Sequence, residues 1–231
     1  MRSIMSWENS IRDPDNDQMK VLNNLLEEYA KTEYGRNFGA EEVESIQDYR
    51  KYFPIITYRD IKPHLEEVKR GNYKSFLSEE PSSWVLTRGT TGEPKIFPVT
   101  RRHLREIFEC GSRAVVNYVL RSGDLDILEG GVLNLNFPSN VKMLNIGGRK
   151  VVYGYSSGTY AKLNPTFSGL SLIPRQEEID ALKTGLSPKD WERRFEFIYQ
   201  RAKNEKIVCI IGVAPVQASF GRYLKRRHGI Y

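Results

Sequence analysis

The sequence is poor in the residues that build disulfide frameworks and metal sites. Its 231 residues include two cysteines, Cys110 and Cys209, and three histidines. The cysteines are too far apart for a CxxC motif and too few for a disulfide framework, which fits a reducing cytosol. His64, His103 and His228 lack partners at the spacing of a zinc signature. We therefore expect a structural role for each histidine and assign no metal-ligating residue.

Long apolar runs are also missing. The longest, IVCIIGVAPV at residues 207–216, is far shorter than the roughly 20 residues that a membrane-spanning helix needs. The N-terminal stretch MRSIMSWENSIRD has no apolar core of the kind that secretory signals carry. These absences predict a cytoplasmic protein without a membrane partner.

The charge is moderately positive, with 35 Lys and Arg, 29 Asp and Glu, and a formal net charge of +6. This balance suits an acidic partner such as a nucleotide, a carboxylate or nucleic acid. The basic residues are spread along the chain, and the densest cluster, LKRRHG at 224–229, falls where a helix is expected to end and where cations favour the helix dipole. A basic patch interleaved with aromatics is not evident, so we expect no nucleic-acid partner.

Hydrophobic periodicity predicts an alternation of helices and strands. The expected helices cover 17–34, 43–52, 58–69, 101–121, 187–206 and 215–229, and the expected strands cover 82–88, 95–100, 130–138 and 207–215. The strand at 207–215 is expected to be buried. The glycine-rich and tyrosine-rich segment 146–160 is expected to be a hairpin or a loop pair of unassigned register. Strands and helices in this order predict an α/β fold with at least partly parallel pairing.

The stretch TRGTTGEPK, residues 87–95, is the strongest candidate for a functional site. Its glycines let backbone N–H groups turn inward as an anion-binding nest, and its threonines add hydroxyl donors. Lys95 supplies a compact positive charge, and Pro94 stiffens the turn. The alternatives are a plain hairpin turn and a nucleotide-hydrolase P-loop, but a P-loop needs another spacing and a following helix. The stretch therefore predicts a phosphate-binding loop between two strands.

This motif resembles the [ST]-[ST]-G-T-T-G-x-P-K phosphate loop of the adenylate-forming enzymes, the acyl- and aryl-CoA ligase superfamily. The branch it resembles is the auxin-responsive-promoter family, whose plant members are acyl-acid amido synthetases; archaeal and bacterial members look closer. The segments that carry this resemblance, in order, are TEYGRNFG, FPIITYRDIKPHLEEVKRG, SSWVLTRGTTGEPKIFPVT and DWERRF. The resemblance runs from about Leu22 to the C-terminus. It implies that residues 1–231 form a single α/β unit, an incomplete N-terminal part of a larger adenylate-forming domain with a mixed sheet flanked by helices.

The resemblance also implies a reaction. A carboxylate of a small acid attacks the α-phosphate of ATP bound with Mg²⁺, and the acyl group then passes from the acyl adenylate to an amine or thiol acceptor. The protein contributes mainly positioning and charge stabilisation. Lys95 is implied as the catalytic residue, stabilising the departing pyrophosphate. The residues implied to bind the cofactor are Thr87, Arg88, Gly89, Thr90, Thr91 and Gly92.

The sequence departs from the family pattern in two respects. Arg88 stands where a small residue is usual, and both a phosphate contact and an outward orientation remain open for it.

The family's aromatic-G-x-[ST]-E motif, its ribose-binding aspartate and its C-terminal lysine would lie beyond Tyr231. We therefore expect the chain alone to be inactive. A non-catalytic nucleotide-binding module and one half of a split enzyme are the alternatives. A sheet that lacks its remaining strands would expose an apolar edge. We therefore expect this edge to be covered by a second copy of the chain or by a missing C-terminal portion.

The segment YGYSS at 153–157 mimics the missing motif but lacks its glutamate. We interpret it as structural, with its tyrosines packing a turn. Glycine-rich turns with aromatics are also common at the mouths of ligand sites. The longer segment 147–160 is therefore also a candidate wall of an acyl pocket.

Overall fold

The computed structural model describes residues 2–87, 94–167 and 169–230. The chain divides into two compact units, which are described separately below. The first unit consists of Met1–Ser83, Pro98–Thr100 and Leu144–Val151, and the second of Trp84–Phe97, Arg101–Met143 and Val152–Tyr231. None of the described helices is long and apolar enough to cross a membrane.

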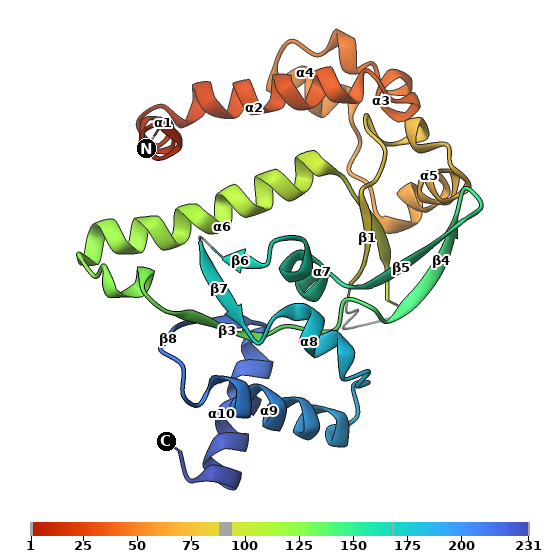
Figure 1. The fold of residues 1–231 in the computed structure, drawn as a ribbon. Coiled ribbons are helices and arrows are strands. Elements are labelled where there is room, and N and C mark those ends of the chain that lie inside the picture. Colours follow the sequence, from red (N-terminus) through yellow and green to blue (C-terminus); the bar gives the residue numbers. More distant parts are fainter. Residues whose placement is uncertain (1, 88–93, 168, 231) are drawn as a thin grey trace. The chain divides into compact units, whose positions relative to one another are not determined.

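The first unit is mainly helical (Figure 1). Its helices are α1 (Arg2–Arg12), α2 (Pro14–Tyr29), α3 (Glu33–Asn37), η1 (Ala40–Glu42), α4 (Ile46–Tyr52), α5 (Tyr58–Arg70) and η2 (Tyr73–Ser75). The helix expected over 17–34 is divided after Tyr29, because Thr32 begins α3 by accepting a hydrogen bond from the N–H of Gly35. A small core of Leu26, Ala40 and Phe53 joins α2, α3, η1 and α4.

Four strands form the first sheet, in the order β2-β1-β5-β4, and the division between the units passes through them. Their bounds are Ser83–Leu86 for β1, Ile96–Val99 for β2, Lys142–Ile146 for β4 and Arg149–Tyr155 for β5. The strands β1 and β5 are parallel, with Val85 opposite Gly154 and Leu86 opposite Tyr155. The segment of unassigned register thus contains β5, preceded by a turn at two positive-φ glycines.

The second unit contains a second sheet, in the order β6-β7-β3-β8. Its strands are β3 (Gly131–Leu135), β6 (Thr166–Phe167), β7 (Leu170–Ile173) and β8 (Ile207–Gly212). Its helices are α6 (Arg101–Ser122), η3 (Asp126–Leu128), α7 (Ser156–Leu163), α8 (Gln176–Ala181), α9 (Pro188–Ala202) and α10 (Ala214–His228). Because β3 is parallel to both β7 and β8, the expectation of partly parallel pairing is confirmed. The mixed α/β class with helices flanking the sheets is confirmed as well.

The strand β3 is the centre of this unit, and all of its residues are buried. Successive side chains of a strand point to opposite faces of the sheet, so β3 contributes to the packing on both faces. Leu133 and Leu135 pack into a core with residues of α9 and α10, whereas Val132 packs with Ala161 of α7 and Leu172 of β7. Strands of a parallel sheet that are covered on both faces are mostly apolar, and Asn134 is the one polar side chain of β3.

The strand β8 corrects the expectation of a buried strand. It forms at Ile207–Gly212, but it lies at the end of the strand order and its side chains are half-buried or exposed. Ile210 is 49% exposed. The physical reason is that one side of β8 pairs with β3, while no strand of the described residues pairs with its other side. An apolar sequence therefore indicates a strand here without fixing how deeply it is buried.

The start of α9 agrees with its predicted signal, since Ser187 and Asp190 form a reciprocal capping box. Within the same helix Arg194 is fully buried. Its guanidinium donates to the hydroxyl of Thr184 at 2.7 Å and lies 4.3 Å from the ring centre of Trp191. Burial lowers the pKa of Arg194 to about 10. The side chain thereby ties the loop before α9 to the helix.

Candidate functional site

The two described ends of the predicted phosphate loop are joined by two hydrogen bonds. The N–H of Thr87 donates to the carbonyl oxygen of Lys95 at 2.8 Å, and the N–H of Lys95 donates to Oγ1 of Thr87 at 3.2 Å. Thr87 directly follows β1 and Lys95 directly precedes β2, so the two predicted strands that flank the stretch are confirmed. Thr87 is half-buried and Lys95 is exposed.

The other predicted residues of this loop, Arg88, Gly89, Thr90, Thr91 and Gly92, lie outside the described residues. Their contacts to phosphate, and the orientation of Arg88, therefore stay predictions.

The loop leaves the sheet beside the start of a helix. Because β1 and β5 are parallel with Leu86 opposite Tyr155, Thr87 and Ser156 follow these two strands at the same edge. Ser156 is the first residue of α7. The first turn of a helix presents N–H groups without intrahelical partners and the positive end of the helix dipole. This edge therefore combines features that favour an anion.

The segment YGYSS is a junction between strand and helix, where a packed turn was predicted. Tyr153 is buried, and the ring of Tyr155 lies 5.1 Å from that of Phe137, so both tyrosines have the predicted structural role. The serines are placed differently, because β5 ends at Tyr155 and α7 begins immediately after it. Ser157 accepts a hydrogen bond from the N–H of Phe137 at 3.3 Å.

Two glycines allow the segment that follows β3 to lie against this junction. A Cβ atom on Gly158 would be 1.9 Å from the carbonyl oxygen of Phe137. On Gly154 it would be 2.3 Å from the carbonyl carbon of Ser139. Neither distance can accommodate a side chain, so glycine is required at both positions by close approach of the backbone.

A buried network of polar side chains fixes the same segment. Asp180 of α8 accepts from both the N–H of Ser139, at 2.9 Å, and its hydroxyl. Gln176 donates to the carbonyl oxygen of Phe137 at 3.1 Å and accepts from Asn134 at 3.2 Å. The side-chain partners Asn134, Ser139, Gln176 and Asp180 are 6% exposed or less. Such networks hold one backbone geometry because a broken bond leaves a buried polar group unpaired.

Replacing Asp180 by asparagine is expected to lower the free energy of unfolding by about 2–3 kcal/mol. The asparagine side chain has one acceptor oxygen where the aspartate has two. Its NH₂ group would face either the N–H or the hydroxyl of Ser139, both of which donate to Asp180 in the wild type. Urea unfolding followed by circular dichroism measures the change. The matched control is Glu177→Gln on the exposed side of the same helix, expected within about 0.5 kcal/mol of the wild type. Equal stability of the two variants would contradict the role of the network.

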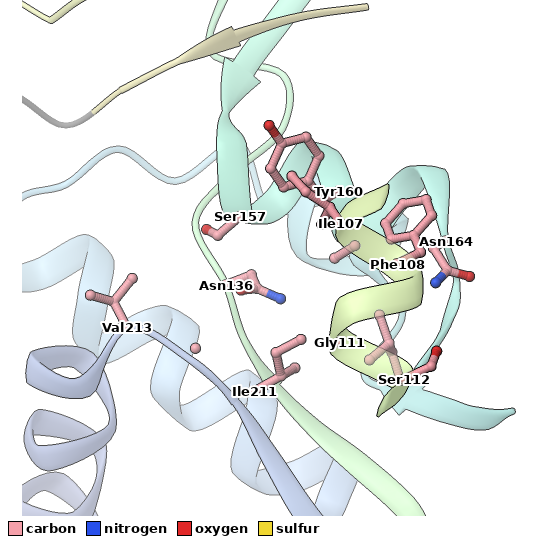
Figure 2. A pocket seen from close by; sticks show the side chains of 13 residues that line it. Ile107, Phe108, Gly111, Ser112, Asn136, Ser157, Tyr160, Asn164, Ile211 and Val213 are labelled. Carbon is pink, nitrogen blue, oxygen red and sulfur yellow. The ribbon is translucent and has the colours of Figure 1, made fainter. Parts of the chain in front are cut away.

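A cavity of about 320 Å³ lies within the second unit, between α6, α7 and the carboxyl ends of the strands (Figure 2). Three of its lining residues directly follow or end strands: Asn136 after β3, Gly212 at the end of β8 and Val213 after it. The complete lining is Ile107, Phe108, Gly111, Ser112, Asn136, Ser157, Tyr160, Ala161, Asn164, Leu172, Ile211, Gly212 and Val213. Small-molecule sites of α/β proteins commonly lie at this edge of the sheet.

The walls of the cavity are apolar in the middle and polar at a few points. None of its lining residues in the described part of the chain carries a formal charge at neutral pH. The hydroxyl of Tyr160 lies 3.1 Å from Nε2 of His103. Burial raises the pKa of Tyr160, so its hydroxyl stays protonated at neutral pH. The cavity therefore suits the apolar body of a small molecule.

Part of this lining could be predicted from the sequence. The segment 147–160 was a candidate wall of a pocket, and Ser157 and Tyr160 of that segment do line the cavity. The contributions of α6, of Asn136 and of Val213 were not predicted. Asn136 and Val213 could be found only from the strand arrangement, because residues that follow parallel strands come together at the same edge of a sheet. Among the described residues, no group of three or more His, Cys, Asp or Glu side chains could hold a metal ion.

Comparison with known proteins gives a family match over most of the chain. Residues 3–194 match the GH3 family N-terminal domain. Indole-3-acetic acid-amido synthetase GH3.2 of Arabidopsis thaliana is 32% identical over 106 residues, which are 45% of this chain and 19% of that protein. Jasmonoyl–L-amino acid synthetase JAR4 of Nicotiana attenuata is 24% identical over 138 residues, 59% of this chain and 23% of that protein.

Two solved structures share the fold. The GH3.15 acyl acid amido synthetase superposes with a TM-score of 0.69 at 19% identity, covering 96% of this chain and 38% of that structure. A structure of AtGH3.15 in complex with 2,4-DB gives a TM-score of 0.57 at 17% identity, covering 90% and 41% of the two chains. This chain thus spans less than half the length of the relatives it matches. By the match over residues 3–194, the chain belongs to the GH3 family, within the part described as its N-terminal domain.

Proposed function

We propose that this chain is the N-terminal, ATP-phosphate-binding part of an adenylate-forming ligase. The enzyme activates a small carboxylic acid: one carboxylate oxygen bonds to the α-phosphorus of ATP, and the bond to pyrophosphate breaks. The acyl group then passes to an amine or thiol, with AMP leaving. In this proposal residues 1–231 are one incomplete part of a larger domain, and the enzyme works in the cytoplasm.

One observation carries the proposal. Thr87, the first residue of the predicted phosphate loop, and Ser156, the first residue of α7, follow two paired strands at one edge of the first sheet, because Leu86 is opposite Tyr155. Ser157 and Tyr160 of that helix line the cavity. A phosphate tail held by the loop and an acid held in the cavity would therefore come together near the first turn of α7. Bringing two reactants together in this way is the main contribution that such an enzyme makes.

The residues present suit a nucleotide. Lys95 is exposed at the end of the loop and would place its ammonium on the phosphates, and Thr87 would orient the loop through its bonds to Lys95. Mg²⁺ usually binds through phosphate oxygens, waters and one or two carboxylates. It would therefore enter with ATP and neutralise the phosphate charge that develops during transfer.

The experiment that tests this function is carboxylate-dependent exchange of labelled pyrophosphate into ATP. The chain is assayed alone and together with a polypeptide that supplies the remaining part of the GH3 fold. We expect ATP binding by the chain alone, no exchange by the chain alone, and exchange in the mixture when an acid is added. Failure of the chain to bind ATP would overturn the proposal.

The same assay distinguishes the alternatives. ATP binding without exchange in either preparation would favour a non-catalytic nucleotide-binding module. Exchange by the chain alone would show that it is complete, against the expectation of an incomplete part. Analytical ultracentrifugation of both preparations would show whether the chain associates with itself or with the added portion.

A further inference from the structure

One end of the cavity carries two polar side chains with unused hydrogen-bonding capacity. Ser112 lies on α6, and Asn164 follows the last residue of α7; both line the cavity. Within the described part of the chain, neither side chain makes a hydrogen bond to another protein group. In Figure 2 they lie with Phe108 on the right of the cavity, whereas Ser157 and Val213 lie on its left.

The helix α7 sets the separation of the two ends. Ser157 is in its first turn and Asn164 is at its C-cap, so their separation of seven positions corresponds to about 10 Å along the helix axis. The apolar residues of the cavity walls include Ile107, Leu172 and Ile211. A ligand that fills this space needs an apolar body and a polar group at each end.

The end near Asn164 favours a hydrogen-bond donor. The last carbonyl groups of α7 point toward its C-terminal end, which carries the negative end of the helix dipole. The side-chain oxygens of Ser112 and Asn164 add two acceptors. A ligand with an apolar end would leave these groups desolvated without partners, and that costs binding free energy.

We propose that Ser112 and Asn164 are specificity residues that select acids whose apolar body carries a hydroxyl or amino group roughly 8–10 Å from the carboxylate. This inference rests on the proposed function, because that function places the reacting carboxylate at the Ser157 end. Ser112 and Asn164 are half-buried, and a ligand that fills the cavity would cover them. An acid that lacks the distal donor would then leave both side chains without a hydrogen-bond partner.

The test uses a matched pair of acids, 3-(4-hydroxyphenyl)propanoate and 3-phenylpropanoate, titrated against the whole chain by ligand-observed NMR. One or two hydrogen bonds are expected to make the hydroxylated acid bind about tenfold more tightly. Ser112→Ala and Asn164→Leu are each expected to reduce this ratio below about threefold, mainly by weakening the hydroxylated acid. The control is Ser219→Ala on α10, whose hydroxyl bonds the carbonyl oxygen of Pro215 and which does not line the cavity.

The outcomes separate the two proposals. Equal binding of the two acids by the wild type, or an unchanged ratio in both variants, would overturn the specificity role and leave the acid site standing. Binding of neither acid to the wild type would overturn the acid site itself, and the specificity role with it. Thermal unfolding of each variant confirms that the compared proteins are folded.

Discussion

Replacing Gly158 by alanine is expected to lower the free energy of unfolding by at least about 3 kcal/mol, or to prevent folding of the second unit. The added Cβ would lie 1.9 Å from the carbonyl oxygen of Phe137 and 3.0 Å from Nε2 of Gln176. Relief requires α7 to move away from the segment after β3. That movement breaks the bond from the N–H of Phe137 to Ser157 and disturbs the bond from Gln176.

The matched control for this substitution is Gly221→Ala in α10. No heavy atom lies within 4 Å of a Cβ built on Gly221. Because alanine is the better helix former, this variant is expected to be up to about 1 kcal/mol more stable than the wild type. Urea unfolding measures both variants. Stability of Gly158→Ala within about 0.5 kcal/mol of the wild type would show that the junction does not pack as described.

Replacing Lys95 by alanine is expected to weaken ATP binding by about 10- to 100-fold, the range for hydrogen bonds to charged groups. The hydrogen bonds between Thr87 and Lys95 use the main chain of Lys95, so the loop ends should stay joined without the ammonium group. The loss therefore reports the contact of the side chain with phosphate. Isothermal titration with Mg²⁺ and ATP measures it.

The control for Lys95 is Lys189→Ala, which removes the same charge from an exposed position in the first turn of α9. Its ATP affinity should stay within about twofold of the wild type, because a distant exposed charge is screened by salt. Equal affinities of the Lys95 variant and the wild type would show that this lysine does not contact the nucleotide.

Local sequence signals predicted the longest helices and four of the strands. The apolar spacing over 101–121 corresponds to α6, and the Ser187 signal marks the residue before α9. The run at 130–138 corresponds to the fully buried β3. Each of these signals is contained within one segment, so a reading of neighbouring residues is enough to find it.

The cavity could not be predicted in the same way, because its walls come from segments far apart in the chain. Asn136 and Val213 come together because β3 and β8 are parallel, and Phe108 reaches the same cavity from α6. The bonds between Asp180 and Ser139 join residues 41 positions apart. The burial of β8 was overestimated for a related reason: strand order, which sets burial, is not encoded in the run itself.

The central claim is that the loop from Thr87 to Lys95 binds the phosphate tail of ATP. The most direct measurement compares the affinities of the whole chain for ATP, inorganic tripolyphosphate and AMP, each with Mg²⁺. The account predicts that ATP and tripolyphosphate bind at least about 30-fold more tightly than AMP, because charge-assisted hydrogen bonds form only with the longer tail. Equal affinities for ATP and AMP, together with no binding of tripolyphosphate, would contradict it.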